Sequence, residues 1–409
     1  MPRPTGNTRL RAARLAAGYS SQQDLANALT ARGVPVGTRQ VRRWESANPP
    51  LPNAEVRHAL VELLGQDLGA LGFQVPEGST AGGRPLRSLI APANRGPVRT
   101  PNAVQPATAG ADFLAVTRAH RRLYWTVAPA TLHPAVSAHA TLGGQLLDVT
   151  TGRTRQTLAA ALAESWLLAG RMEFFDLREP DRAGDTWVRA LQAAGEAEDA
   201  LLGAAILAHM AFIPGWAGSR DQAAERMIAA RAYARKGPAS AEFLAWLDAV
   251  EAECETRCGN TRTALNLIGH GEDVLAAGGE YASPEWMDWF SPVRLAAFKG
   301  NTQLKAGHLP QARETLLDVL EALPQDADKQ RTVVLGDLAA VEAAAHDPVA
   351  AAAYAVRALE LLETHWYATG LERVREVRRA LAPWQNEPCV RDLDDRLYGW
   401  GTTLSALAN

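Results

Sequence analysis

Three arginines in one short segment have the side-chain chemistry needed to bind a nucleic acid. In the segment Thr38–Trp44, Val41 and Trp44 are three residues apart, so on a helix both can face a core. The polar side chains then point outward: Arg39, Arg42 and Arg43, with Thr38 and Gln40 at the flanks. Guanidinium groups bind phosphates and guanine edges, and Gln and Thr suit neighbouring contacts. The segment therefore predicts a helix that binds DNA.

A second helix must hold this one in place. Ser21 is a candidate N-cap, while Leu25 and Ala26 face the core, with Ala26 small enough for a crossing helix. Apolar residues recur at short helical spacings with tight turns between them over residues 8–73. We expect a small helical domain over these residues.

These two strings resemble the lambda-repressor-like helix-turn-helix family, also called the XRE family. The resemblance covers Leu10 to Phe73 and includes an intact Ser-Gln-x-x-Leu-Ala opening and a Val-x-x-Trp-Glu close. It implies a five-helix DNA-binding domain. About five more residues separate Leu29 from Val41 than in the compact family pattern, so we expect a longer loop and an altered packing angle.

The resemblance also implies a role for each polar residue. Gln22 would hold a phosphate, Thr38, Arg39 and Arg43 would reach bases, and Gln40 and Arg42 would touch the DNA backbone or neighbouring bases. The expected DNA-binding set is Gln22, Gln23, Thr38, Arg39, Gln40, Arg42 and Arg43. The alternative is that the arginines only form a solvated helix face. Trp44 is expected in the core.

The charge of the chain is divided between its two ends. The formal net charge is −3. Residues 1–111 hold thirteen Arg and six acids, a charge of +7, whereas residues 112–409 hold 29 basic and 39 acidic residues, a charge of −10. This asymmetry indicates a segment that binds a polyanion joined to one that does not.

A linker should separate the two parts. Residues 74–111 contain six Pro and five Gly with few large apolar side chains, which is too little to build a core. We therefore expect a helix-turn-helix domain at 8–73, a flexible linker at 74–111 and a helical-repeat domain at 112–409.

The third part, residues 112–409, contains a sequence repeat. Each of Gly218, Gly259, Gly307 and His346 precedes by five residues a small residue in the following helix, namely Ala223, Ala264, Ala312 and Ala351, and Ala183 marks a weaker copy. Small residues permit close approach of paired helices, and Gly permits the turn between them. The unit at 298–324, with Gly300, Gly307, Ala312, Leu316 and Pro324, resembles a tetratricopeptide repeat with a longer pitch. We expect an all-helical solenoid closed by helices at 373–381 and 390–407.

The inner surface of such a solenoid is a groove that binds peptides or other proteins. The alanine register places eight residues there: Phe212, Trp216, Trp246, Glu253, Arg257, Arg294, Asn301 and Lys305. Their polar groups suit a peptide backbone or a carboxylate, and the aromatic rings supply apolar contact. Alternatively, Phe212 and Trp246 only fill gaps between helices. Trp286 and Trp289 are expected in the core.

The order of these parts resembles the peptide-responsive RRNPP regulators and related actinobacterial regulators. The resemblance implies a homodimer on a double-stranded DNA operator and a signalling peptide, small molecule or partner protein in the groove. The Arg-rich composition, with only four Lys, fits a high-GC genome. The competing hypothesis is a protein-interaction adaptor, in which the array binds a partner protein and the small N-terminal domain is a docking module.

Enzyme motifs are not evident. The sequence has no Gly-rich phosphate loop, no His-Glu-x-x-His, no Gly-x-Ser-x-Gly and no Cys-x-x-Cys, so we expect neither catalysis nor a cofactor or metal. No apolar run is long enough to span a membrane, and the first residues do not resemble a signal peptide. A cytoplasmic location without membrane association is expected.

Overall fold

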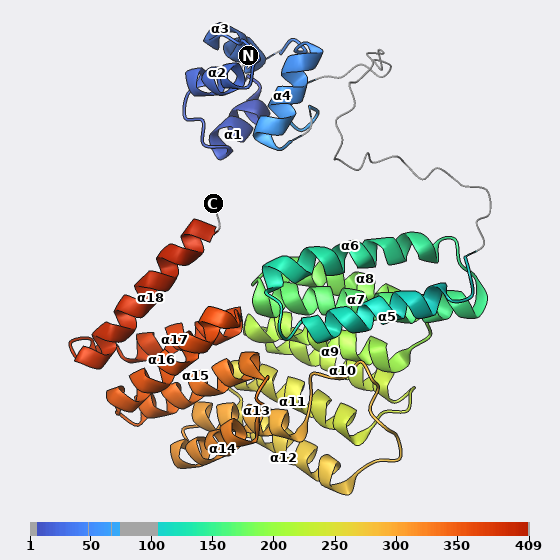
Figure 1. Ribbon diagram of the computed structural model, residues 1–409, viewed down its shortest axis with the longest axis vertical. Coiled ribbons are helices and arrows are strands. Elements are labelled where there is room, and N and C mark those ends of the chain that lie inside the picture. The colour runs from blue at the N-terminus through green and yellow to red at the C-terminus, as the bar shows by residue number, and fades with distance from the viewer. Residues whose placement is uncertain (1–5, 48, 67, 74–104, 408–409) are drawn as a thin grey trace. The chain divides into compact units, whose positions relative to one another are not determined.

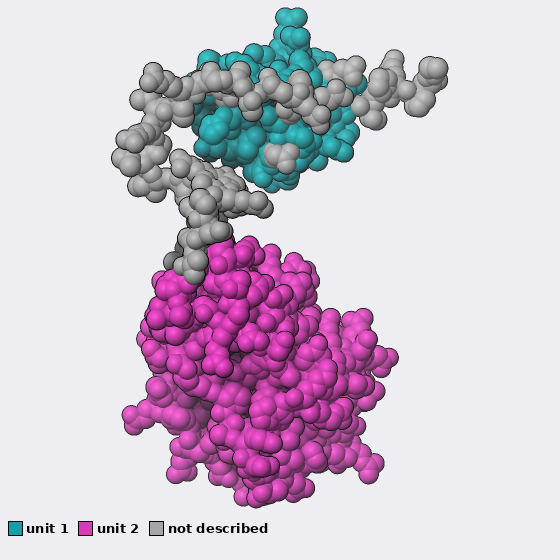
Figure 2. Space-filling model, turned by 90° about the vertical axis from the view of Figure 1, so that its right-hand side faces the viewer, with its two compact units in different colours: residues 1–98 teal, residues 99–409 magenta. Residues whose placement is uncertain are grey.

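The computed structural model describes residues 6–47, 49–66, 68–73 and 105–407. The chain divides into two compact units, Met1–Val98 and Arg99–Asn409, which are coloured separately in Figure 2. Every regular element in the described residues is a helix, so the predicted all-helical fold is confirmed. Most of the expected linker, residues 74–104, lies outside the described residues.

The N-terminal unit is built from α1 (Thr8–Ala16), α2 (Gln22–Ala31), α3 (Thr38–Trp44) and α4 (Ala54–Leu64). Ser21 caps α2 in a capping box: its hydroxyl accepts from the Asp24 amide, and the Asp24 carboxylate accepts from the Ser21 amide. Leu10, Leu25 and Leu60 are fully buried in one core with Val41 and Trp44. The prediction that Leu25 on α2 and Val41 and Trp44 on α3 face the core is therefore confirmed.

The expectation of five helices in this unit is wrong for the described residues. Leu68–Phe73 forms turns in which Leu71 and Phe73 are buried. Gly72 has φ of +81°, and a Cβ there would lie 2.3 Å from Oδ1 of Asn7. Asn7 donates to the carbonyl of Leu71 at 2.9 Å. The chain turns back here because only glycine permits this conformation and this contact.

The connection between α2 and α3, residues 32–37, is long, as the spacing predicts. Val34 and Val36 in this connection are buried and join the core of the unit. The added residues therefore pack against the helices instead of looping into solvent.

The C-terminal unit is a stack of helical hairpins (Figure 1). Its elements are α5 (Ala109–Leu123), α6 (Pro129–Leu147), α7 (Gly152–Arg171), the π-helix η1 (Met172–Asp176), α8 (Pro180–Glu196), α9 (Ala200–Trp216), α10 (Arg220–Ala234), α11 (Ala241–Arg257), α12 (Thr261–Ala277), α13 (Pro292–Lys305), α14 (Leu309–Ala322), α15 (Asp328–Ala344), α16 (Pro348–Thr364), α17 (Ala368–Ala380), the 3₁₀ helix η2 (Ala382–Trp384) and α18 (Pro388–Leu407). The solenoid prediction is confirmed. The first helix begins at Ala109, within the segment assigned to the linker, and no described helix is long and apolar enough to cross a membrane.

The repeat register is also confirmed. The five marker alanines are all buried on second helices of the hairpins: Ala183, Ala223, Ala264, Ala312 and Ala351. The residue five positions before each has positive φ, with values of 63°, 76°, 83°, 79° and 64° at Arg178, Gly218, Gly259, Gly307 and His346. Each hairpin thus turns at an equivalent left-handed residue, even where the residue is not glycine.

The first and last hairpins of the array meet across its inner side. Lys329 on α15 pairs with Asp176 of η1 at 3.0 Å, and the Thr369 hydroxyl on α17 donates to the carbonyl of Phe175 at 3.0 Å. These partners are 153 and 194 residues apart in the sequence. The contacts close the inner surface of the array into a cavity.

Candidate functional sites

The arginine face of α3 is the first candidate site. Val41 and Trp44 are 0% and 5% exposed, which fixes the rotation of the helix. Arg39, Arg42 and Arg43 are exposed on its other side, and none forms an ion pair with any residue that the structure describes. Three unpaired positive charges on one exposed helix provide a surface that attracts phosphates.

The other four residues of the expected DNA-binding set are engaged within the unit. Gln22 donates to Oε2 of Glu45 at 2.6 Å, and Gln23 donates to Asn27 at 2.9 Å. The Thr38 hydroxyl donates to Gln23, and Oε1 of Gln40 accepts from the Gly37 amide at 3.0 Å. These bonds order the start of α2 and α3 and leave the arginines as the free groups.

An ion pair that the sequence did not reveal lies beneath α3. Nε of Arg14 is 2.7 Å from Glu45, and both side chains are buried. Arg14 also donates to the carbonyls of Tyr19 and Ser20 at 2.7 and 3.0 Å. Glu45 therefore ties the end of α3 to α1 and, through Gln22, to α2. The pairing explains why Arg14 is not part of the exposed basic surface.

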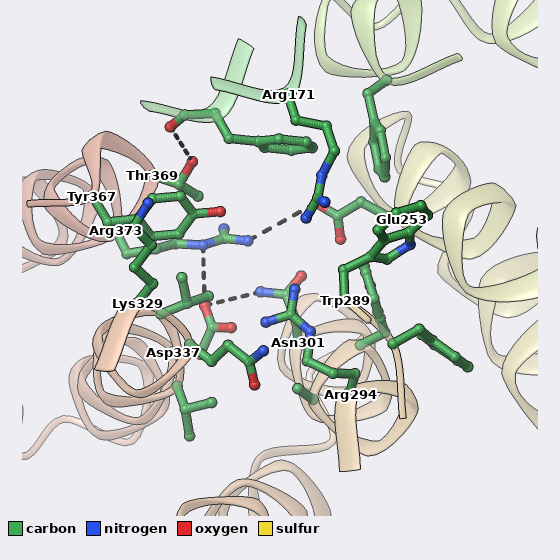
Figure 3. A pocket seen from close by; sticks show the side chains of 18 of the residues that line it. Arg171, Glu253, Trp289, Arg294, Asn301, Lys329, Asp337, Tyr367, Thr369 and Arg373 are labelled. Carbon is green, nitrogen blue, oxygen red and sulfur yellow. Dashed lines mark hydrogen bonds and ion pairs between the residues drawn. The ribbon is translucent and has the colours of Figure 1, made fainter. Parts of the chain in front are cut away.

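The second candidate site is the cavity on the inner side of the array (Figure 3). Its volume is about 130 Å³ when only positions open to the centre of a water molecule are counted. That space holds on the order of ten waters, which is enough for a compact organic group. Side chains from all the first helices, α7, α9, α11, α13, α15 and α17, line it.

The cavity brings together six of the eight predicted groove residues: Phe212, Trp216, Trp246, Glu253, Arg294 and Asn301. Arg257 and Lys305 do not line it. Arg257 instead pairs with Glu253 at 2.7 Å and lies 3.8 Å from the centre of the Trp216 ring. The positive charge of Lys305 contributes to lowering the pKa of Glu253. Neither residue lines the cavity, but the charges of both act on Glu253, which does.

Two carboxylates in the cavity are already compensated. Asp337 accepts from Asn301 at 3.0 Å and lies 3.3 Å from Nε of Arg373. Burial acts to raise the pKa of Glu253, but Arg257 and Arg373 outweigh it and lower the pKa. Burial raises the pKa of Asp337 in spite of Arg373. Figure 3 shows Asn301, Asp337, Arg373 and Glu253 joined by a hydrogen bond and ion pairs.

Two guanidinium groups in the cavity are not compensated. Arg171, at the end of α7, is 7% exposed and contacts the rings of Tyr124 and Trp289, with distances of 5.2 and 4.5 Å to their centres. Arg294, in the first turn of α13, has its pKa lowered by burial and by the charge of Arg171. Neither guanidinium forms an ion pair with any described residue. Both point into the cavity in Figure 3.

Several lining residues were missed by the sequence analysis: Arg171, Trp289, Lys329, Asp337, Tyr367, Thr369 and Arg373. Trp289 is buried, as expected of a core residue, but its ring also forms part of the wall. The marker alanines could have revealed one further lining residue. Val333 precedes Ala351 by the same number of residues as Trp246 precedes Ala264 and Arg294 precedes Ala312. Val333 does line the cavity. No repeat position points to Arg171 or Lys329.

No family model matches the chain. A search of curated proteins also found no match. The chain is similar to the apo form of the quorum sensor NprR from B. thuringiensis, with 13% sequence identity, a TM-score of 0.44, and coverage of 71% of this chain and 74% of that chain.

Proposed function

We propose that the protein is a DNA-binding transcriptional regulator, with the N-terminal unit as the DNA reader and the helical array as a sensor and dimerisation domain. The observation that carries the proposal is the face of α3, where Arg39, Arg42 and Arg43 are exposed and unpaired beside a buried Val41 and Trp44. The +7 charge of residues 1–111 supports it, because most non-specific DNA affinity comes from contacts with phosphates.

On DNA, the exposed arginines would lie in the major groove. A guanidinium can bond the O6 and N7 atoms of guanine together, or it can hold a phosphate. Two heads of a homodimer would read half-sites about 34 Å apart, or a multiple of that distance. The domain boundaries expected from the sequence, 8–73, 74–111 and 112–409, are part of this proposal, except that the array begins at Ala109. A double-stranded operator is also part of it.

The array would transmit a signal through its cavity. A ligand there contacts α7 and α9 on one side and α13, α15 and α17 on the other. Because the first and last hairpins meet at Asp176 and Lys329, a bound ligand would favour one curvature of the array over another. Only a ligand that binds the two curvatures unequally can shift affinity for DNA.

The DNA-binding half is tested by fluorescence anisotropy with a random duplex over a range of salt concentrations. A DNA reader should lose affinity steeply as salt rises, and Arg42→Ala should flatten the slope of log K against log salt by about 0.9 if Arg42 holds one phosphate. Arg32→Ala is the matched control, because Arg32 is an exposed arginine that pairs with Glu62 at 3.7 Å. Absence of binding at low salt would favour the adaptor hypothesis.

The operator is found by incubating the purified full chain with genomic DNA fragments and sequencing those that are retained. A shared motif with two-fold symmetry supports a dimeric reader. Enrichment of fragments without any common motif would leave only non-specific DNA binding and would contradict the proposal of a regulator.

A further inference from the structure

The cavity of the array carries more positive than negative charge. Four cationic side chains line it, Arg171, Arg294, Lys329 and Arg373, against two carboxylates, Glu253 and Asp337. Lys329 is paired with Asp176 behind the wall, and Arg373 is paired with Asp337 and lies 3.9 Å from Glu253. The charge that remains without an ion pair is that of Arg171 and Arg294.

These two charges are costly to the protein without a ligand. Arg171 is 7% exposed, and its Nε has no hydrogen-bond acceptor. Its charge acts to lower the pKa of Asp176 and, more strongly than that of Arg121, the pKa of Asp288, but neither carboxylate lies within ion-pair distance of Arg171. Asp176 pairs with Lys329, and Asp288 lies 3.4 Å from Arg121. Arg294 lies in the first turn of α13, where the helix dipole disfavours a cation. Buried charge is ordinarily compensated, so a missing anion is the simplest account of the pair.

The backbone at Arg171 is also unusual. Arg171 is the last residue of α7, and the π-helix η1 follows it directly. This widened turn places Phe175 in the wall of the cavity and Asp176 against Lys329. π-helical turns are rare and often occur at functional sites. The local geometry thus supports a site in which Arg171 is held in position for a ligand.

The remaining walls define the rest of the ligand. Ten of the 24 lining residues are Phe, Trp or Tyr, so the part of the ligand beyond its anionic group must be apolar. His209 adds no charge near neutral pH, because burial lowers its pKa to about 3. Glu253 and Asp337 would repel a second negative charge, which favours a single carboxylate over a phosphate dianion.

We propose that the cavity binds an organic carboxylate with a compact apolar or aromatic body, and that Arg171 and Arg294 hold the carboxylate from opposite sides. The ligand is either a small organic acid or the C-terminal residue of a peptide, which present the same chemistry. This inference deepens the proposed function, on which its regulatory meaning rests, but binding itself does not depend on DNA.

The test is calorimetric titration of the full chain, without DNA, with five probes. These are phenylacetate, its neutral isostere phenylacetamide, inorganic phosphate, and a tetrapeptide ending in Phe with either a free or an amidated C-terminus. Phenylacetate should bind about tenfold or more tightly than phenylacetamide, because a lost charge-assisted hydrogen bond costs about that factor. It should also bind more tightly than phosphate, which lacks an apolar body and carries a second negative charge that Glu253 and Asp337 repel. If the tetrapeptide with a free C-terminus binds more tightly than phenylacetate and its amidated form does not, the proposal is supported and the ligand is identified as the end of a peptide.

Variants locate the site. Arg171→Gln and Arg294→Gln should each weaken phenylacetate about tenfold, whereas Arg189→Gln should not, because Arg189 is an exposed arginine stacked on Trp166 outside the cavity. Circular dichroism confirms folding of each variant. Equal binding of phenylacetate and phenylacetamide, no binding of either carboxylate probe, or unchanged binding in Arg171→Gln and Arg294→Gln overturns the inference. If the chain binds phenylacetate but shows no DNA binding in the anisotropy experiment, only the proposed function is overturned.

Discussion

The arginines of α3 and the two arginines of the cavity all lack an ion pair in the described part of the chain, but their surroundings differ. Arg39, Arg42 and Arg43 are exposed, so water solvates them at little cost. Arg171 is buried and Arg294 partly buried, among aromatic rings, where an uncompensated charge costs free energy. An unpaired arginine on a surface is common in any protein, whereas one in a cavity requires an explanation such as a ligand.

The paired charge in the cavity should be the most sensitive to substitution. Asp176→Asn leaves Lys329 without its partner in a site where both side chains are at most 4% exposed. Removing one member of a buried pair should lower the free energy of unfolding by about 3–5 kcal/mol. Chemical denaturation followed by tryptophan fluorescence measures this. The double variant Asp176→Asn with Lys329→Met should recover part of the loss, and a double variant as unstable as the single one would show that the charge is not the cause.

Substitutions of the exposed arginines of α3 should affect DNA binding more than stability. Arg39→Ala should reduce discrimination between operator and random duplex by about 1–3 kcal/mol if Arg39 reads a base. Competition anisotropy with both duplexes measures the difference. Equal loss on the two duplexes would reassign Arg39 to a phosphate, and no loss on either would reduce the α3 arginines to a solvated face.

The cavity should also make the array sensitive to acid. His209 is 2% exposed, and its pKa is about 3, because burial, and secondarily the charge of Arg171, disfavour its protonation. Below pH 6.5 the unfolded chain takes up a proton that the native state does not. Stability therefore falls with falling pH from 6.5 towards 3, by about 1.4 kcal/mol per pH unit from this residue. Denaturation at pH 7.5, 6.5 and 5.5 should show a shallower fall for His209→Phe, and parallel curves would contradict the assignment.

Replacing an unpaired arginine of the cavity should raise the free energy of unfolding, whereas Asp176→Asn should lower it. Arg171→Met keeps the unbranched apolar stem of the side chain but removes the guanidinium, with its charge and its contact with the Trp289 ring. We expect the ligand-free protein to gain about 1 kcal/mol in unfolding free energy, because an apolar residue of similar volume avoids desolvating a charge. Thermal unfolding measures the gain. A loss of several kcal/mol would show that Arg171 has a structural role instead of being held for a ligand.

The smallest effect should follow from the same kind of change on α3. Arg42→Ala should alter unfolding free energy by less than about 0.5 kcal/mol, because Arg42 is exposed and forms no ion pair with the described residues. Chemical denaturation of the N-terminal transition measures it. A loss above about 1 kcal/mol would mean that Arg42 has a structural partner and is not available to DNA.

The sequence predicted features that depend on residues close together in the chain. The turn before Ala312, with Gly307 at φ of +79°, follows from local backbone freedom, and the inward face of α3 follows from the spacing of Val41 and Trp44. The groove positions of Glu253 and Asn301 follow from the same repeat. The fifth N-terminal helix was predicted from family resemblance, and Gly72 with its contact to Asn7 replaced it by turns.

Only the tertiary structure decided which groups meet in the cavity. Arg171 comes from α7, far in the sequence from Lys329 on α15 and Arg373 on α17, and it joins them because the array curves until η1 meets α15 and α17. Curvature is the sum of small rotations between successive hairpins, so no single repeat encodes it. The sequence thus determined the hairpins and the residues on their inner faces, while closure of the array decided that two arginines there would form no ion pair with the residues that the structure describes.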